Sequence, residues 1–315
     1  MTSKPRFLTF VFTAGAVLAG SQARAGFTVA VNFDGDATGA YSSYYADIRS
    51  GLQKAADEWS RYVQTASTTL AIRFEFSSDP SRIPTANAGS LIFDQSVPSV
   101  GGVRTYESGT LAKLTRSPGL VGPGGLDAVF NLSDHWLKDL MWFGPVANLP
   151  SNKLDSNFVF MHELGHILGF VSYRQADGSL TSVGGSPRQY TFDAETVKIG
   201  GGYYFDGTFA TIANGGAPVA LTGGNYSHVG NSGSDLVNDV MNGVQSKLGK
   251  KDYELSGVDV GVLADLGYEL TAAGRALVYG QGPAAVPEPA SIVALALGLC
   301  GVGGWRAAPR RRRAA

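Results

Sequence analysis

Cysteine is almost absent from this chain of 315 residues. The only one is Cys300, which lies near the C-terminus. The long part of the chain before it therefore has no disulfide and no cysteine metal ligand. A core of this size can be stable without disulfides, so their absence does not argue against export. Histidine is scarce as well, and the sequence has four: His135, His162, His166 and His228.

Long basic runs are absent from the middle of the chain. The first 25 positions carry three basic residues and no acidic one, and the last 30 carry five arginines and Glu288. Residues 26–285 therefore carry 17 basic and 25 acidic side chains, a net charge of −8. Because nucleic acids bind clusters of positive charge, we expect no nucleic-acid partner. Glycine is abundant, with 42 residues against a usual share of about 7%, which favours a loop-rich fold over a helical bundle.

The N-terminus is typical of a secretory signal peptide. Lys4 and Arg6 precede an apolar stretch over Phe7–Gly20, and Ala23-Arg24-Ala25 follows. A basic start, a short apolar run and an A-x-A site mark a segment that is cleaved on export. We therefore expect residues 1–25 to be removed before Gly26, with a retained anchor as the alternative.

The C-terminal residues form a pattern of three parts. VPEPAS at 286–291 is followed by Ile292–Trp305, a run without charge, and then by Arg310–Arg313. The uncharged run is short for a membrane helix, which needs about 20 apolar residues, but its neighbours extend it to about residues 290–308. Arginines remain on the cytoplasmic side, so the preceding domain would lie outside.

This pattern, over residues 286–315, resembles the PEP-CTERM sorting signal of Gram-negative bacteria. The resemblance implies recognition by an exosortase-type sorting enzyme and contact with the membrane through the apolar segment before processing. It further implies a final location at the cell surface, in the outer membrane or in the extracellular matrix. A plain tail anchor is the alternative.

Residues 158–173, FVFMHELGHILGFVSY, contain the pattern that predicts chemistry. His162 and His166 are four residues apart, so on a helix they lie on one face and can bind one metal ion. Neutral imidazoles suit Zn²⁺, which in catalytic sites has three protein ligands and one open position. Glu163 is placed to take a proton from water at the metal and to return it to a leaving amine. The pattern predicts hydrolysis of a peptide bond with one catalytic zinc ion.

The third ligand does not follow from the spacing alone. Position 172, where an extended form of the motif has a histidine, is Ser172. One candidate is His228, which lies far downstream in the segment NYSHVGN. The others are His135, which precedes the motif, and a carboxylate such as Asp193 or Glu195.

From residue 155 to residue 268 the chain resembles the metzincin metallopeptidases, and within them the leishmanolysin-like pattern. HELGHILGF at 162–170 is followed by a long insertion, then by His228, then by Met241. The resemblance implies that His228 is the third zinc ligand and that Met241 forms the Met-turn beneath the zinc. A gluzincin would use Glu195 and an aspzincin Asp193, but neither pattern includes Gly169 and Met241 at these places. The chain departs from leishmanolysin-like relatives outside bacteria, because no cysteine pairs brace the insertion.

Local patterns predict a zincin-like α+β fold of two parts. The N-terminal subdomain, about 26–170, is expected as a twisted mixed sheet with two long helices. Asp127–Leu132 is the expected edge strand, along which an extended substrate would lie. The C-terminal subdomain, about 171–280, is expected to be irregular and to close with a helix. The predicted strands are Phe27–Phe33, Leu70–Phe76, Ser90–Phe93 and Asp127–Leu132, and the predicted helices are Ser43–Val63, the motif helix from Asp155 or Ser156 to Gly169, and Leu255–Tyr268 with Ser256 as its cap.

These observations together predict an exported zinc endopeptidase over residues 26–285. Two other functions stay open. One is a zinc hydrolase of a cell-wall or matrix substrate, and the other is a surface or matrix protein whose metal site is structural. Glu163 favours the enzymes, since a structural site needs no base beside its ligand and has no open coordination position.

Overall fold

The computed structural model describes residues 26–78, 86–90, 93–94, 99, 102–183, 186–231, 234–243 and 248–280. The expected signal peptide at 1–25 and the expected sorting signal at 286–315, with its apolar segment at about 290–308, lie outside the described residues. Within the described ranges, no helix has both the length and the apolar character that crossing a membrane requires.

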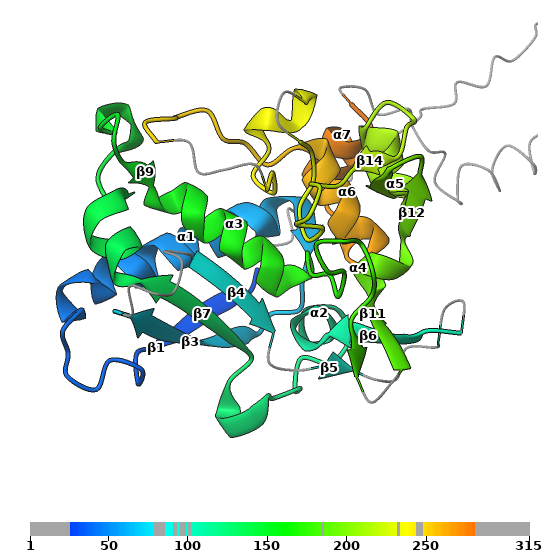
Figure 1. The fold of residues 1–315 in the computed structure, drawn as a ribbon. Helices are drawn as coiled ribbons and strands as arrows, with labels where there is room; N and C mark the ends of the chain where they lie inside the picture. The colour runs from blue at the N-terminus through cyan, green and yellow to red at the C-terminus, as the bar shows by residue number, and fades with distance from the viewer. Residues whose placement is uncertain are drawn as a thin grey trace, which may run out of the picture.

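The chain folds into several small sheets with helices packed against them, which confirms the predicted α+β class (Figure 1). The α-helices of the described residues are α1 (Tyr45–Tyr62), α2 (Gly109–Thr115), α3 (Ser156–Leu168), α4 (Thr191–Ala194), α5 (Thr208–Ala213), α6 (Gly257–Asp265) and α7 (Ala272–Val278). The main sheet has four strands in the spatial order β1 (Thr28–Asn32), β3 (Thr69–Ser77), β7 (Ala128–Ser133) and β4 (Ala86–Ser90).

The main sheet is mixed. β1, β3 and β7 run parallel to one another, and β4 runs antiparallel to β7. Along β3, Leu70, Ile72 and Phe74 are buried while the residues between them are partly exposed, as the alternation in LAIRFEF predicts. The rings of Phe74 and Phe130, on neighbouring strands, stack with centroids 4.5 Å apart. The predicted strands at Phe27–Phe33 and Leu70–Phe76 are therefore confirmed.

The prediction that Asp127–Leu132 forms the edge of this sheet is wrong. The segment is a strand, β7, but it pairs with β3 on one side and with β4 on the other. Its Phe130 and Leu132 are fully buried, as an interior strand requires. β4 takes the edge position instead, and it shares only Ser90 with the predicted strand Ser90–Phe93. Strand order depends on pairing between distant segments, which local alternation does not record.

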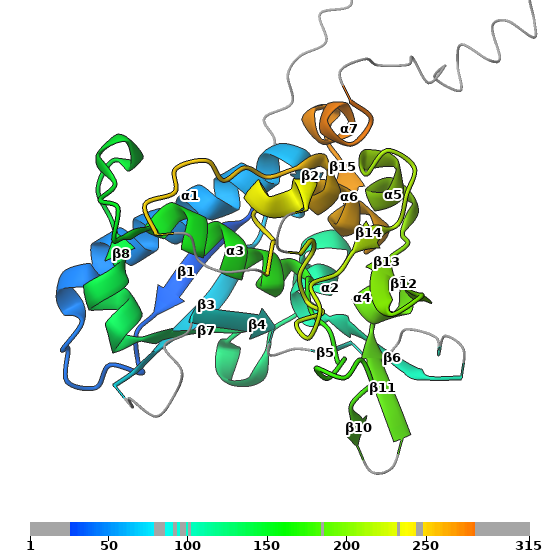
Figure 2. The same ribbon diagram turned by 45° about the horizontal axis from the view of Figure 1, so that its top comes forward.

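The long helices α1 and α3 lie side by side along one face of the main sheet (Figures 1 and 2). Both were predicted, and both occur within two residues of the predicted bounds. Gly51 lets the two helices approach closely, because a Cβ at this position would lie 2.3 Å from the ring of Phe160. Across the helix pair, the indole N–H of Trp59 donates to the carbonyl of Met161 at 3.0 Å. The helix that carries the motif is thus held by α1 at its side and by β4 of the sheet.

The C-terminal subdomain, expected to be irregular, contains short strands and helices. One small sheet has the spatial order β10 (Ser182–Val183), β11 (Ser186–Tyr190), β6 (Arg104–Ser108) and β5 (Phe93–Asp94). A second sheet has the order β12 (Thr196–Ile199), β13 (Gly202–Phe205) and β14 (Val219–Ala220). Two further pairs of strands are β15 (Glu269–Leu270) with β2 (Val63–Gln64), and β8 (Met141–Trp142) with β9 (Leu154–Asp155). Pairing of β11 with β6 and of β15 with β2 connects the two predicted subdomains. Figure 2 shows α5, α6 and α7 together, at the opposite end of the molecule from β8.

Candidate metal centre

The centre begins with α3, whose start and end are set by local sequence. Asp155 is the N-cap, and its carboxylate accepts a hydrogen bond from the backbone N–H of Asn157 at 3.1 Å. The helix ends at Gly169, whose φ of +142° is a conformation that favours glycine. This turn brings the carbonyl of Phe170 back toward the helix, where it accepts from Nδ1 of His166 at 2.6 Å. The end of the helix therefore also orients a side chain of the motif.

Gly165, between the two motif histidines, allows a close contact with Met241. A Cβ at position 165 would lie 2.4 Å from the sulfur of Met241 and 3.2 Å from the ring of Trp59. Met241 is fully buried, and it belongs to a tight turn at Asp239–Asn242 that is closed by a hydrogen bond of 3.2 Å from the N–H of Asn242 to the carbonyl of Asp239. We call these four residues the Met241 turn.

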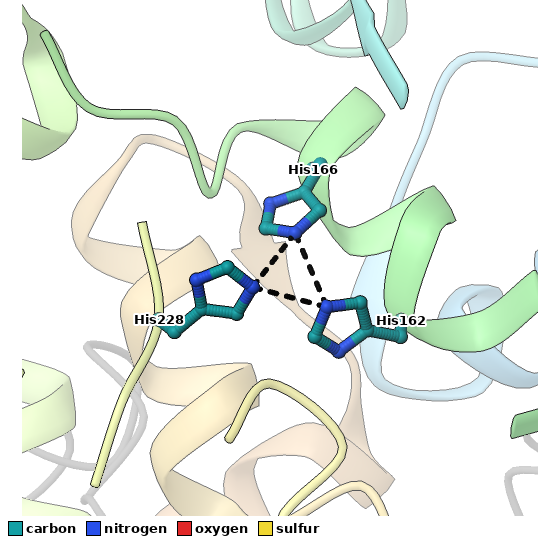
Figure 3. A group of neighbouring side chains, drawn as sticks. All are labelled: His162, His166 and His228. Carbon is teal, nitrogen blue, oxygen red and sulfur yellow. Dashed lines mark hydrogen bonds between the residues drawn. The ribbon is translucent and has the colours of Figure 1, made fainter. Parts of the chain in front are cut away.

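His228 reaches the motif helix on a short extended segment beside the Met241 turn. Its neighbour Val229 forms isolated bridges with Leu221 and with Asn242, so the segment is held from two sides. Gly243 leaves room for the imidazole, because a Cβ there would lie 2.7 Å from Cβ of His228. The resulting position of His228 is opposite His162 and His166 (Figure 3).

The three histidines His162, His166 and His228 point their Nε2 atoms at one another (Figure 3). The Nε2 atom of His228 lies 3.1 Å from that of His162 and 3.1 Å from that of His166, and the remaining separation is 3.3 Å. In a tetrahedral zinc site with Zn–N bonds of about 2.0–2.1 Å, two ligand nitrogens are about 3.3–3.4 Å apart. The triangle of nitrogens therefore has nearly the size that such an ion requires, and the group could hold a metal ion.

Hydrogen bonds at the other ring nitrogens determine which nitrogen of each ring carries the proton. Nδ1 of His162 contacts the carbonyl of Val240 at 2.6 Å, and Nδ1 of His228 contacts the carbonyl of Asn225 at 3.3 Å. His166 makes the equivalent bond to Phe170. A carbonyl can only accept, so each Nδ1 carries the proton and each Nε2 presents a lone pair. Three lone pairs at this separation repel one another unless a cation lies between them.

Burial keeps the three imidazoles neutral, which is the form that binds metals. Burial lowers the pKa of His162, and it lowers the pKa of His166 to about 3, with a further contribution from the neighbouring His162. Burial also holds the pKa of His228 well below its usual value, and both other histidines add to this shift. All three therefore stay unprotonated at neutral pH.

Glu163 is buried, with 5% of its surface exposed, and it follows His162 directly on α3. The structure thus places a buried carboxylate in the same helical turn as two of the metal-capable imidazoles.

The other sequence candidates lie outside the histidine group. His135 is exposed and pairs with Asp139, with 3.0 Å between Nδ1 and the carboxylate. Asp193 is buried and accepts from the hydroxyl of Ser172 at 2.5 Å and from two backbone N–H groups, so it braces the chain after α3. Glu195 is exposed near two other acidic residues, and both partial desolvation and these neighbours raise its pKa. Among the described residues, the metal-capable group comprises His162, His166 and His228 alone.

Sequence reasoning missed two features around this group. The first is the set of backbone carbonyls that orient the imidazoles, which cannot be predicted from the types of the residues that carry them. The buried carboxyl pair of Asp239 and Asp259 was also missed, although the sequence offers two hints. An acid stands two positions before Met241, and Ser256 with Asp259 has the spacing of a helix capping box, which the structure contains.

No protein-family model matches the chain, and no curated protein or solved structure matches it either.

Proposed function

We propose that this protein is an exported zinc-dependent endopeptidase with the architecture of a zincin, closest to the metzincins. The convergence of three imidazole Nε2 atoms within 3.3 Å of one another, next to a buried glutamate, carries the proposal. The mixed sheet with an antiparallel edge strand, the motif helix across it and the Met241 turn beneath Gly165 support the proposed architecture.

Zinc is the proposed metal because all three candidate ligands are neutral imidazoles. Sites of this composition suit zinc, whereas calcium and magnesium require oxygen ligands. A structural zinc site has four protein ligands, but the group in the described part of the chain has three members. The fourth position is then open to water and substrate, as catalysis requires.

The histidines and Glu163 have different roles in the proposed reaction. A zinc ion held by His162, His166 and His228 would supply a Lewis acid that lowers the pKa of water and polarises a carbonyl. Glu163 accepts the proton of the attacking water and then delivers it to the nitrogen of the leaving amine. The buried surroundings of Glu163 limit competing protonation from bulk water and keep it close to the reacting atoms.

The substrate would bind as an extended peptide along β4. This strand pairs with β7 on one side and, within the described residues, with no strand on the other. An exposed strand edge offers backbone N–H and C=O groups that bind an extended peptide by strand addition. Because α3 packs against β4, a peptide at this edge would pass close to the motif helix.

Export and sorting are a separate part of the proposal. The sequence patterns at 1–25 and 286–315 support removal of a signal peptide before Gly26 and processing by an exosortase-type enzyme, which would leave the domain at the cell surface, in the outer membrane or in the extracellular matrix. Mass spectrometry of the protein recovered from cells would test this. A mature form that begins at Met1 and ends at Ala315 would contradict it.

The activity is tested with the purified zinc-loaded protein and a diverse peptide library, read by mass spectrometry. The matched variant is Glu163→Gln, which keeps the size of the side chain and removes its basicity. We expect cleavage by the parent protein and its loss in the variant and under chelation. Zinc binding without cleavage of any peptide would argue for a non-protein substrate or a structural metal site.

A further inference from the structure

One peptide group connects the Met241 turn to the histidine cluster. Its carbonyl, on Val240, accepts from Nδ1 of His162 at 2.6 Å. Its N–H, on Met241, donates to Oδ1 of Asp239 at 3.0 Å. A carboxylate and an imidazole therefore bind the two ends of the same amide. Because hydrogen bonds in a chain polarise one another, negative charge at the N–H end makes the carbonyl a stronger acceptor.

Asp239 forms a buried pair with Asp259 of α6. Ser256 connects the two, since its hydroxyl donates to Oδ2 of Asp239 at 2.5 Å and its N–H donates to Oδ2 of Asp259 at 3.2 Å. Burial and the neighbouring Asp239 raise the pKa of Asp259 well above its usual range. Burial also raises the pKa of Asp239, but hydrogen bonds from Asp259, Ser256 and Met241 oppose this shift.

The pair therefore holds one proton, and its negative charge is on Asp239. Two buried carboxylates in contact cannot both be ionised at neutral pH. Asp239 accepts from the hydroxyl of Ser256, from the N–H of Met241 and from the carboxyl of Asp259, whereas Asp259 accepts from two backbone N–H groups, that of Ser256 and, as a smaller contribution, that of Met241. The charge consequently lies on the carboxylate that accepts from the N–H of the amide bound to His162.

We propose that Asp239 is a positioning residue for the metal ligand His162, and that it acts through the Val240–Met241 peptide. Its carboxylate fixes the direction of the Val240 carbonyl and strengthens it as an acceptor, so that Nε2 of His162 becomes a better donor to a metal. Ligating histidines commonly donate their second nitrogen to a carboxylate or a carbonyl, and loss of that partner costs about 10–100-fold in metal affinity. In this protein the carboxylate of Asp239 does not contact the imidazole of His162 directly, because the Val240–Met241 peptide group lies between them. This inference rests on the proposed metal-binding role of the three histidines.

His166 provides a comparison within the same centre. Its Nδ1 donates to the carbonyl of Phe170 at 2.6 Å, the same distance as in the bond from His162 to Val240. The N–H of that second peptide group, on Val171, donates to the backbone carbonyl of Gly169 at 2.8 Å. The two histidines thus have acceptors at equal distance, and only the acceptor of His162 has a carboxylate behind it.

The first test compares Asp239→Asn with Asp259→Asn in the full chain, using zinc alone as the probe and competition with a chelator as the readout. Each variant removes one carboxyl group from the same buried pair. We expect Asp239→Asn to weaken zinc binding by about 10-fold or more, and Asp259→Asn to change it by less than about threefold, because Asp239 then keeps its charge. Equal zinc affinities in the parent and Asp239→Asn would overturn the inference and leave the proposed function standing. A parent chain that binds no zinc would overturn both.

The second test needs no variant and therefore holds even if Asp239→Asn does not fold. Histidine side chains labelled with ¹⁵N in the zinc-loaded parent report the Nδ1 protons directly by NMR. The carboxylate behind Val240 should place the Nδ1 proton of His162 further downfield than that of His166. Equal positions, or the reverse order, would overturn the inference, and a purely structural role of Asp239 would not produce the difference.

Discussion

Gly165→Ala probes the contact between the motif helix and the Met241 turn. An added methyl group would lie 2.4 Å from the sulfur of Met241, and ordinary contact begins near 3.4 Å, so the sulfur must move by about 1 Å. Met241 is fully buried, and Trp59 lies 3.2 Å from the same methyl position, so neither side has room to yield. We therefore expect the substitution to destabilise the fold and to displace the turn that binds His162.

The expected change in the free energy of unfolding follows from two opposing effects. Overpacking a filled core costs about 1–3 kcal/mol, and the severity of this overlap favours the upper end. Alanine is the better helix former by about 1 kcal/mol, which offsets part of the cost. The net loss is about 2 kcal/mol, and in a domain of this size it lowers the melting temperature by about 4–8 °C.

The assay is thermal unfolding of the metal-free and the zinc-loaded protein, with zinc affinity measured alongside. Gly119→Ala is the matched control, because no atom lies within 4 Å of its added methyl group. Met241→Ala in the Gly165→Ala background should recover part of the loss, giving a coupling of about 1 kcal/mol between the two sites. A Gly165→Ala protein more stable than the parent by about 1 kcal/mol would refute the close contact, since helix propensity alone would then decide the outcome.

Three further perturbations test the account. His228→Ala should lose zinc under mild chelation while His135→Ala retains it, and full zinc retention by His228→Ala in a metal assay would contradict the assignment of the third ligand. Asp193→Ala leaves buried donors without an acceptor, so it should lower the free energy of unfolding by about 3 kcal/mol with zinc affinity unchanged; chemical denaturation and chelator competition measure the two quantities. Burial lowers the pKa of His166 to about 3 in the folded metal-free protein, against about 6.5 in the unfolded chain, so protonation favours unfolding. Between pH 6.5 and about 3 this histidine alone should lower the free energy of unfolding by about 1.4 kcal/mol for each pH unit, and His162 and His228, whose pKa burial also lowers, add to the fall. Equal free energies of unfolding of the metal-free protein at pH 7 and pH 5 would show that this histidine is not buried as described.

The parts of the structure that the sequence predicts are those with local causes. Asp155 and Gly169 bound the motif helix through a side-chain cap and a positive φ, and both effects involve only neighbouring residues. The four-residue spacing of His162 and His166 places them on one face of any helix. The approach of His228 was implied by a resemblance to a family pattern and not by local periodicity, and the structure places it against the other two.

The parts that sequence reasoning missed depend on contacts between distant segments. The edge of the main sheet was assigned to Asp127–Leu132, but pairing with β4 makes that strand interior. Strands such as β10 and β14 have two residues each and exist because their partners hold them, so no local pattern reveals them. Asp239 and Asp259 are buried together only because α6 packs beneath the Met241 turn.

X-ray absorption spectroscopy of the zinc-loaded protein tests the central claim most directly. The account predicts one zinc ion per chain with three imidazole nitrogens and one oxygen at about 2.0–2.1 Å, and His228→Ala should reduce the imidazole count to two. A site with four protein ligands, or a chain that binds no stoichiometric zinc, would contradict the proposal of an open catalytic metal centre.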